Sequence, residues 1–227
     1  MNTTYYIDGF NLYHLRLKPN RRFRWLNLKL LADQLSPAPS IVTKINFYTA
    51  RVSTKIDPDA PARQRVYLKA LSSEPLIEIH YGRFLFGERL AKLAVPLETR
   101  PQPYVWNLPA PILVKINKIE EKGSDVNLAS HLIRDAFLKK FDTAVVVSND
   151  TDLVEPIRIV TQEIGKHVGI VAPKRPIKGG PPIPSPSLKK YATFVLYIDN
   201  AHLTAAQFPQ MVTLADGTAY SKPPTWV

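Results

Sequence analysis

The stretch TAVVVSNDTD, residues 143–152, joins an uninterrupted, uncharged run to a polar segment that contains two aspartates. Such a run is typical of a strand buried on both faces, because its side chains point alternately to opposite sides of the sheet. We therefore predict a central strand over Thr143–Val147, followed at its carboxyl end by Asp150 and Asp152. Strands of this kind occur mainly in α/β proteins, in which helices cover both faces of a parallel sheet.

Strand-like and helix-like patterns alternate on both sides of this stretch. Runs of β-branched and aromatic residues predict strands, and apolar residues at helical spacing predict helices. Because parallel strands need crossover connections, the alternation predicts a doubly wound, mostly parallel sheet with helices on both faces. Strands are expected at 3–7, 41–50, 76–86, 143–147, 167–171 and 193–198, and helices at 25–35, 60–72, 125–138 and 153–165.

Two proline-rich segments interrupt the alternation. Residues 87–111 carry five prolines from Pro96 onward and are expected to form a surface insertion or an irregular hairpin. Residues 173–186 contain six prolines, two adjacent glycines and three basic residues, which predicts a long exposed loop. We therefore divide the chain into a main domain, 1–172, and a proline-rich basic loop with a C-terminal extension, 173–227, packed on the same domain.

The composition limits the kinds of protein that this chain can be. Its 227 residues contain no cysteine, which excludes disulfides, thiolate zinc sites and cysteine nucleophiles. No apolar run approaches the roughly 20 residues that cross a bilayer, and the N-terminus lacks the features of a secretory signal, so we expect no membrane association and a cytoplasmic location. Thirty Lys and Arg against nineteen Asp and Glu give a net charge of +11, which attracts polyanions such as nucleic acid.

The helix expected at 125–138 places an acid at its start. Ser124 is positioned as its N-cap, so Asp125 would lie in the first turn, where the helix dipole favours an anion. The apolar face of this helix is expected to contain Val126, Ala129, Leu132, Ile133, Ala136 and Phe137.

Four aspartates are expected at one edge of the sheet, because ligand crevices in such sheets lie outside the carboxyl ends of the strands. Asp8 follows the first strand, Asp150 and Asp152 follow the central strand, and Asp125 begins a helix. Singly, each is also explained as a turn or capping residue. Together, their mutual repulsion of several kcal/mol predicts a divalent cation, and oxygen ligands without thiolate indicate Mg²⁺ or Mn²⁺.

The segments that carry these acids resemble the three motifs of NYN-domain proteins, the LabA group of PIN-like nuclease relatives. They are YIDGFNL at 6–12, EKGSDVNLA at 121–129 and VSNDTDL at 147–153. The third departs from the usual Ser-Gly-Asp-Ser-Asp wording at Asn149 and Thr151 but keeps both acids. The resemblance covers about 5–171 and implies a PIN-like fold and a Mg²⁺- or Mn²⁺-dependent ribonuclease, with a catalytic domain at 1–172. It implies that the metal is held by Asp8, Asp125, Asp150 and Asp152, beside the motif residue Asn11.

Basic clusters with interleaved aromatic residues supply a track for RNA. Phosphates would contact the cations while unpaired bases stack on Tyr13, Phe23 and Trp25. Equally, Phe23 and Trp25 could belong to the core, and Lys122 could be a solvated lysine. The candidate RNA-binding residues are Arg21, Arg22, Arg24, Lys122, Lys174, Arg175 and Lys178.

Three functions are compatible with these patterns. The first is an (endo)ribonuclease that hydrolyses RNA phosphodiester bonds, with tRNA or another structured RNA as substrate. The second is a non-catalytic RNA-binding regulatory protein of the same fold, although a pure binder gains nothing from a repulsive acid cluster. The third, a small-phosphate hydrolase, is disfavoured because the Gly179-Gly180 pair lacks the Gly-Lys-Ser/Thr pattern of a phosphate loop. A homodimer is compatible with the PIN-like resemblance.

Overall fold

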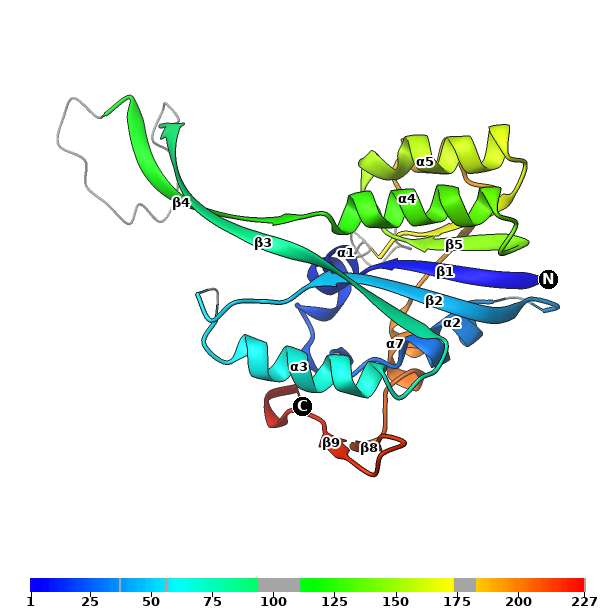
Figure 1. Ribbon diagram of the computed structural model, residues 1–227, viewed down its shortest axis with the longest axis horizontal. Coiled ribbons are helices and arrows are strands. Elements are labelled where there is room, and N and C mark those ends of the chain that lie inside the picture. The colour runs from blue at the N-terminus through cyan, green and yellow to red at the C-terminus, as the bar shows by residue number, and fades with distance from the viewer. Residues whose placement is uncertain (37, 56, 94–110, 174–182, 227) are drawn as a thin grey trace.

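The computed structural model describes residues 1–36, 38–55, 57–93, 111–173 and 183–226, and it is built around a seven-stranded sheet of order β4-β3-β2-β1-β5-β6-β7 (Figure 1). All neighbouring strands are parallel except β3 and β4. The α/β fold with a mostly parallel sheet is therefore confirmed. The strands are β1 (Asn2–Asp8), β2 (Ile41–Ala50), β3 (Ile77–Lys92), β4 (Leu113–Lys122), β5 (Thr143–Val147), β6 (His167–Val171) and β7 (Phe194–Leu196).

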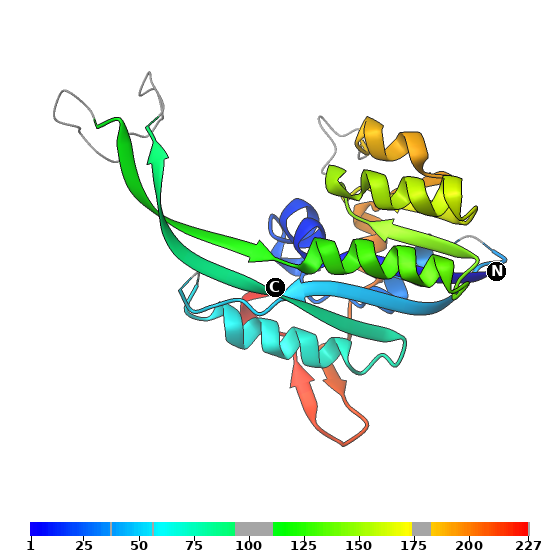
Figure 2. The ribbon, with the colours of Figure 1, turned by 45° about the horizontal axis from the view of Figure 1, so that its top comes forward.

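Helices cover the sheet from both sides and close two separate cores (Figures 1 and 2). Side chains along β1 point alternately to the two faces of the sheet, so Tyr5 and Ile7 pack in one core and Tyr6 packs in the other. On the first side lie α2 (Leu28–Leu35), α3 (Ala60–Leu71) and α7 (Asn200–Ala205); on the second lie α4 (Ser124–Phe137), α5 (Val154–Arg158) and α6 (Pro186–Tyr191). Short α1 (Gly9–Leu12) continues as a π-helix over Tyr13–Leu17, and α5 continues as one over Ile159–Glu163.

The order of the strands reverses between β1 and β5. From β1 the chain builds outward through β2 and β3, and it then returns to place β5 on the other side of β1 before adding β6 and β7. At such a reversal the connections leave in opposite directions and open a crevice at the carboxyl ends of the two strands. Asp8 and the segment after Val147 lie at this crevice.

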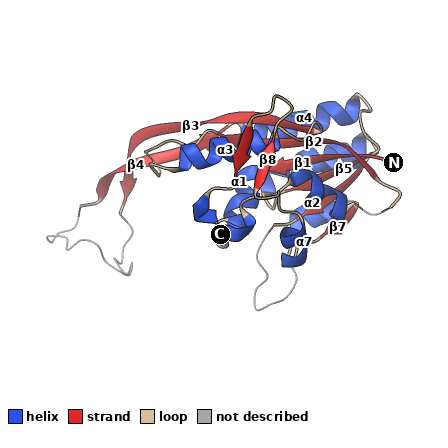
Figure 3. Cartoon of the chain, turned by 90° about the horizontal axis from the view of Figure 1, so that it is seen from below, coloured by secondary structure: helices blue, strands red, loops and turns tan. Residues whose placement is uncertain are grey.

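Strands β3 and β4 continue beyond the main sheet as an antiparallel ribbon (Figure 3). β3 pairs with β2 only as far as Gly82, and residues 83–92 then pair with residues 113–122. The prediction that regular structure ends near Phe86 was wrong, and strand β4 was not predicted. Because most side chains of the ribbon are exposed on both faces, its sequence lacks the apolar and polar alternation of a half-buried strand. Residues 94–110 of the expected insertion lie outside the described residues.

Helix α4 differs from the prediction in its cap and in its buried face. Gly123 is the N-cap, with a φ of 101° that favours glycine, and Ser124 is the first helical residue instead. The buried stripe recurs every four residues, at Leu128, Leu132 and Ala136. Val126 and Phe137 were expected on that face, but they lie well around the helix from it and are 68% and 74% exposed.

The C-terminal segment returns to the face that carries α2 and α3. Strands β8 (Met211–Thr213) and β9 (Ala219–Ser221) form a small separate sheet, and a 3₁₀ turn at Pro224–Trp226 follows. The Trp226 ring lies 6.2 Å from that of Trp25 and 6.0 Å from that of Tyr67. In the parts of the chain that the structure describes, no helix has the length and apolar character needed to span a bilayer.

Candidate active site

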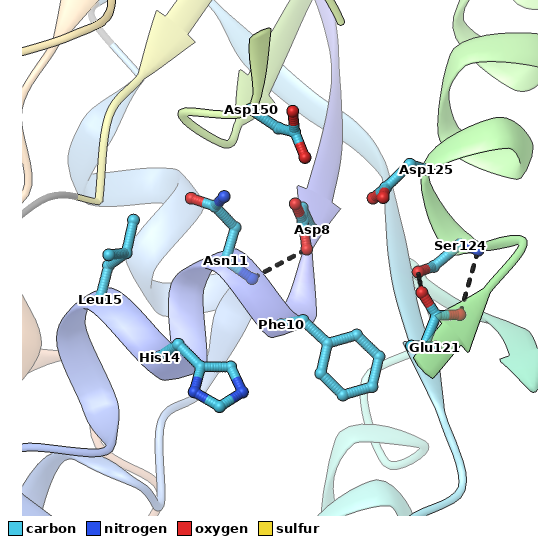
Figure 4. Close-up of a pocket in the computed structure, with 9 residues that line it drawn as sticks. All are labelled: Asp8, Phe10, Asn11, His14, Leu15, Glu121, Ser124, Asp125 and Asp150. Carbon is cyan, nitrogen blue, oxygen red and sulfur yellow. Dashed lines mark hydrogen bonds between the residues drawn. The ribbon is translucent and has the colours of Figure 1, made fainter. Parts of the chain in front are cut away.

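A cavity of about 380 Å³ opens at the carboxyl end of β1 and beside the start of α4. Three aspartates from three different elements point toward its interior (Figure 4). Asp8 ends β1, Asp125 lies in the first turn of α4, and Asp150 follows β5. The other lining residues are Phe10, Asn11, His14, Leu15, Glu121 and Ser124.

Asp8 is buried and held by a hydrogen bond at each carboxylate oxygen. Its Oδ1 accepts from the backbone N–H of Asn11 at 2.9 Å, which caps α1, and its Oδ2 accepts from Oγ of Ser148 at 2.9 Å. Burial raises the pKa of Asp8; these hydrogen bonds lower it in part, and the charge of Asp150 raises it further. The carboxylate is thus fixed in orientation next to a second acid.

Hydrogen bonds join the loop after β5 to Asp8 and Asn11 and also order the loop itself. Oδ1 of Asn11 accepts from the backbone N–H of Asn149 at 3.0 Å, and Oγ of Ser148 accepts from that of Asp150 at 3.1 Å. Asp150 in turn caps the following 3₁₀ turn, since its Oδ1 accepts from the N–H of Asp152 at 3.0 Å. Asn11 therefore positions the loop that carries Asp150, and the capping role expected for Asp152 belongs to Asp150.

Asp125 faces the other acids from across the cavity. Burial, followed by the charges of Asp8, Asp150, Glu121 and Asp152, raises the pKa of Asp125 to about 6. Burial is the largest cause of this shift, and the four neighbouring negative charges add to it. The same crowding would be relieved by a bound cation.

Glu121 is a lining residue that the sequence did not single out. Its carboxylate accepts from the N–H of Ser124 at 3.2 Å and from Oγ of Ser124 at 2.5 Å, so it performs the capping that Gly123 lacks a side chain to perform. The only signal in the sequence was its place in the second motif. Its position depends on β4, a strand that periodicity does not reveal.

The carboxylate oxygens that line the cavity are ligands that suit a hard divalent cation. Three aspartates and one glutamate line it, while none of the lining residues that the structure describes is a lysine or arginine, although the chain carries a net charge of +11. Within the described ranges, no three acidic or histidine side chains meet closely enough to enclose an ion. A cation held by one or two of these carboxylates would complete its coordination with water and substrate oxygens, as Mg²⁺ commonly does.

Of the four predicted aspartates, the structure brings three into the cavity and leaves Asp152 at its edge. Asp152 is exposed and does not line the cavity, although its charge is among those that raise the pKa of Asp125.

Among the described residues, the predicted RNA-binding side chains do not line the cavity. Arg21 and Arg22 are exposed, whereas Arg24 donates to the carbonyl oxygens of Leu17 and Lys18. Lys122 lies 3.4 Å from Glu120 in an ion pair. Lys174, Arg175 and Lys178 lie outside the described residues.

Base stacking on Phe23 and Trp25 was a wrong expectation. Both rings are buried in the core cluster on the α2 side of the sheet, where they are unavailable to a nucleic acid. The alternative assignment of these two rings to the core is correct.

Substituting Gly82 should disturb the packing of Glu121 and Ser124, two residues that line the cavity. A Cβ on Gly82 would lie 2.0 Å from Oε1 of Glu121, 2.8 Å from the carbonyl oxygen of Lys122 and 3.0 Å from the backbone nitrogen of Ser124. Because two of these atoms are backbone, we expect Gly82→Ala to lower the free energy of unfolding by about 1–3 kcal/mol, measured by chemical denaturation. Gly87→Ala on the same strand is the control, since its Cβ would meet nothing within 4 Å. Equal losses in both variants would contradict this packing.

Comparisons with known proteins identify a family for this chain and two more distant similarities. The family model described as NYN domain matches residues 3–199, a range that includes every acid of the cavity. The 6-hydroxy-3-succinoylpyridine 3-monooxygenase HspA of Pseudomonas putida is 26% identical over 248 residues, which cover 100% of this chain and 75% of that protein. The crystal structure of a protein of unknown function from Vibrio parahaemolyticus is 15% identical, covers 88% of this chain and 93% of its own, and has a TM-score of 0.48.

Proposed function

The chain belongs to the NYN-domain family of the PIN-like superfamily, and on that premise we propose that it is a ribonuclease that hydrolyses RNA phosphodiester bonds with Mg²⁺ or Mn²⁺. The observation that carries the proposal is the meeting of Asp8, Asp125 and Asp150 in one cavity at the reversal of strand order. Capping accounts for Asp8 and Asp150 singly, but it does not account for their convergence with Asp125 from a third element. A polyanionic substrate also suits the net charge of +11.

The residues of the cavity divide into holding and positioning roles. Asp8 and Asp150 would hold the cation, and Ser148 and Asn11 keep these two carboxylates oriented through the hydrogen bonds described above. When bound, the cation would polarise the scissile phosphate and lower the pKa of a coordinated water. Asp125 in its ionised form would orient that water as the nucleophile.

The monooxygenase relative raises a competing function. Reduced nicotinamide or flavin nucleotides carry phosphates, which four carboxylates without a lining lysine or arginine among the described residues would repel. A phosphodiester is also anionic, but a cation held by these acids would supply the chemistry of its hydrolysis, whereas hydride transfer from a nucleotide needs no such cation, so the cavity favours hydrolysis. Consumption of NADH in the presence of 6-hydroxy-3-succinoylpyridine, without cation-dependent RNA cleavage, would favour oxygenation instead.

The proposal is tested by incubating purified protein with total RNA, tRNA and single-stranded DNA in Mn²⁺, Mg²⁺ or EDTA. We expect RNA fragments to appear with either cation and to be absent in EDTA. Sequencing the new ends would then separate endonuclease from exonuclease action. RNA that is bound but left intact with both cations would instead support the non-catalytic regulatory protein.

Cation binding should depend on pH through Asp125. Because the pKa of Asp125 is raised from 3.8 to about 6, the folded protein holds this proton more tightly than the unfolded chain does. Without a cation, the free energy of unfolding therefore falls as the pH rises from about 3.8 to about 6. Bound Mn²⁺ opposes that loss, and protons compete with it at low pH. We therefore expect Mn²⁺ to raise the melting temperature more at about pH 7.5 than at about pH 5. Asp125→Asn should remove most of this difference; an equal gain at both pH values would contradict the prediction.

A further inference from the structure

The β3–β4 ribbon has two faces of different composition, set by alternation along its strands. Phe84 and Phe86 point to the same face as Ile119, which pairs with Phe86, and Glu121, which pairs with Phe84. Leu85 points to the opposite face. Because Glu121 lines the acidic cavity, the face with the two phenylalanines is the one that continues into it.

Three aromatic rings connect the cavity to this ribbon. Phe10 lines the cavity, and its ring centroid lies 5.6 Å from that of Phe84 in an edge-on contact. The Phe84 centroid lies 6.4 Å from that of Phe86, which is 39% exposed. We call Phe10, Phe84 and Phe86 the aromatic row. It leads from the acids to a solvent-exposed ring on an arm that projects from the body of the protein (Figures 1 and 3).

A lysine from outside the ribbon lies against the row, since the Nζ atom of Lys55 lies 5.0 Å from the centroid of the Phe86 ring. The paired parts of the ribbon, 83–92 and 113–122, contain six Lys and Arg against three Glu, which is a net charge of +3. By the alternation this net charge lies on the face of Leu85, while the charges on the face of the row balance one another. The row thus leads from an aromatic surface on a basic arm to the acidic cavity.

We propose that the aromatic row binds a single-stranded segment of RNA and leads it into the cavity, an inference that rests on the proposed ribonuclease function. Bases stack on exposed aromatic rings whatever their identity, and nearby lysines attract the phosphates between them. A second copy of the chain fits this arm less well, because two chains that each carry a net charge of +11 would repel each other. The row also continues into the cavity, which a substrate strand requires and a dimer contact does not.

The experiment measures binding without cleavage. A fluorescein-labelled, single-stranded oligoribonucleotide of about 12 nucleotides is titrated with protein in EDTA, and fluorescence anisotropy gives the dissociation constant. Phe84→Ala and Phe86→Ala should each weaken binding about tenfold. Leu85→Ala, on the opposite face of the same strand and 45% exposed in the native protein, should leave it within about twofold. Phe86→Trp, which restores a stacking surface and guards against loss of folding, should bind at least as tightly as the parent.

The outcomes separate this inference from the proposed function. Full affinity in both alanine variants, with RNA cleavage in Mn²⁺ intact, overturns the aromatic row and leaves the ribonuclease in place. Tight binding by the parent that depends on the row, without cleavage in any cation, supports the row and overturns the ribonuclease. Equal affinity for a blunt duplex contradicts stacking. A dimer that dissociates in Phe86→Ala during sedimentation, with RNA affinity unchanged, assigns the row to a second copy.

Discussion

Replacing Asp150 with asparagine is expected to slow cation-dependent RNA cleavage at least about a hundredfold, with little change in folding. The amide keeps the size of the side chain, and its oxygen can still accept the N–H of Asp152 that caps the 3₁₀ turn. What it loses is one of the charges that would hold the cation. A loss of a few kcal/mol in stabilisation of the transition state corresponds to this factor. Single-turnover cleavage of the preferred RNA in Mn²⁺ measures it.

Two matched substitutions test whether the loss of cleavage depends on the position of the carboxylate or only on the removal of one negative charge. Asp33→Asn removes a carboxylate on α2 that pairs with Lys29 and does not line the cavity, and this variant should cleave at the parental rate. Asp152 lies two residues from Asp150 but does not line the cavity. We therefore expect Asp152→Asn to slow RNA cleavage less than Asp150→Asn does. A loss in Asp152→Asn equal to or larger than that in Asp150→Asn would contradict the assignment of direct ligands.

The acids of the cavity could be expected from the sequence because parallel strands bring distant residues to one edge. Thr143–Val147 reads as a strand since burial on both faces excludes charged residues from it, and the acid that follows it must then lie at the same edge of the sheet as the end of β1. Local rules suffice for this step. They also suffice for strands such as Ile41–Ala50 and His167–Val171, whose bounds match the prediction.

The ribbon and what depends on it were missed for a physical reason. A strand exposed on both faces has no need of an apolar face, so no strand is predicted at 113–122 and its end, 118–122, reads as a charged, solvated stretch. The pairing of this strand with β3 places Glu121 on the same face as Phe84, and Phe84 contacts Phe10 across a long separation in sequence. The same limit explains Trp25: a basic, aromatic stretch looks like an RNA-binding surface until the C-terminal segment that covers it is known.

Truncating Trp25 to alanine is expected to lower the free energy of unfolding by about 3–5 kcal/mol. The indole is fully buried, with the rings of Phe208, Tyr67 and Trp226 around it at 5.6, 6.2 and 6.2 Å between centroids. Its Nε1–H also donates to the carbonyl oxygen of Pro209 at 2.7 Å. The substitution therefore leaves a cavity where the C-terminal segment meets α2 and α3. Urea denaturation followed by circular dichroism gives the loss.

A pair of milder substitutions tests which part of that loss comes from the hydrogen bond. Trp25→Phe keeps a ring but strands the Pro209 carbonyl, at a cost of about 1–3 kcal/mol, whereas the Nε1–H of Trp226 has no acceptor among the described residues and Trp226→Phe should cost less. The RNA affinity of folded Trp25→Ala should equal that of the parent, because a core ring stabilises the domain without touching the substrate. Wild-type stability together with a tenfold loss of RNA affinity would return Trp25 to the binding surface.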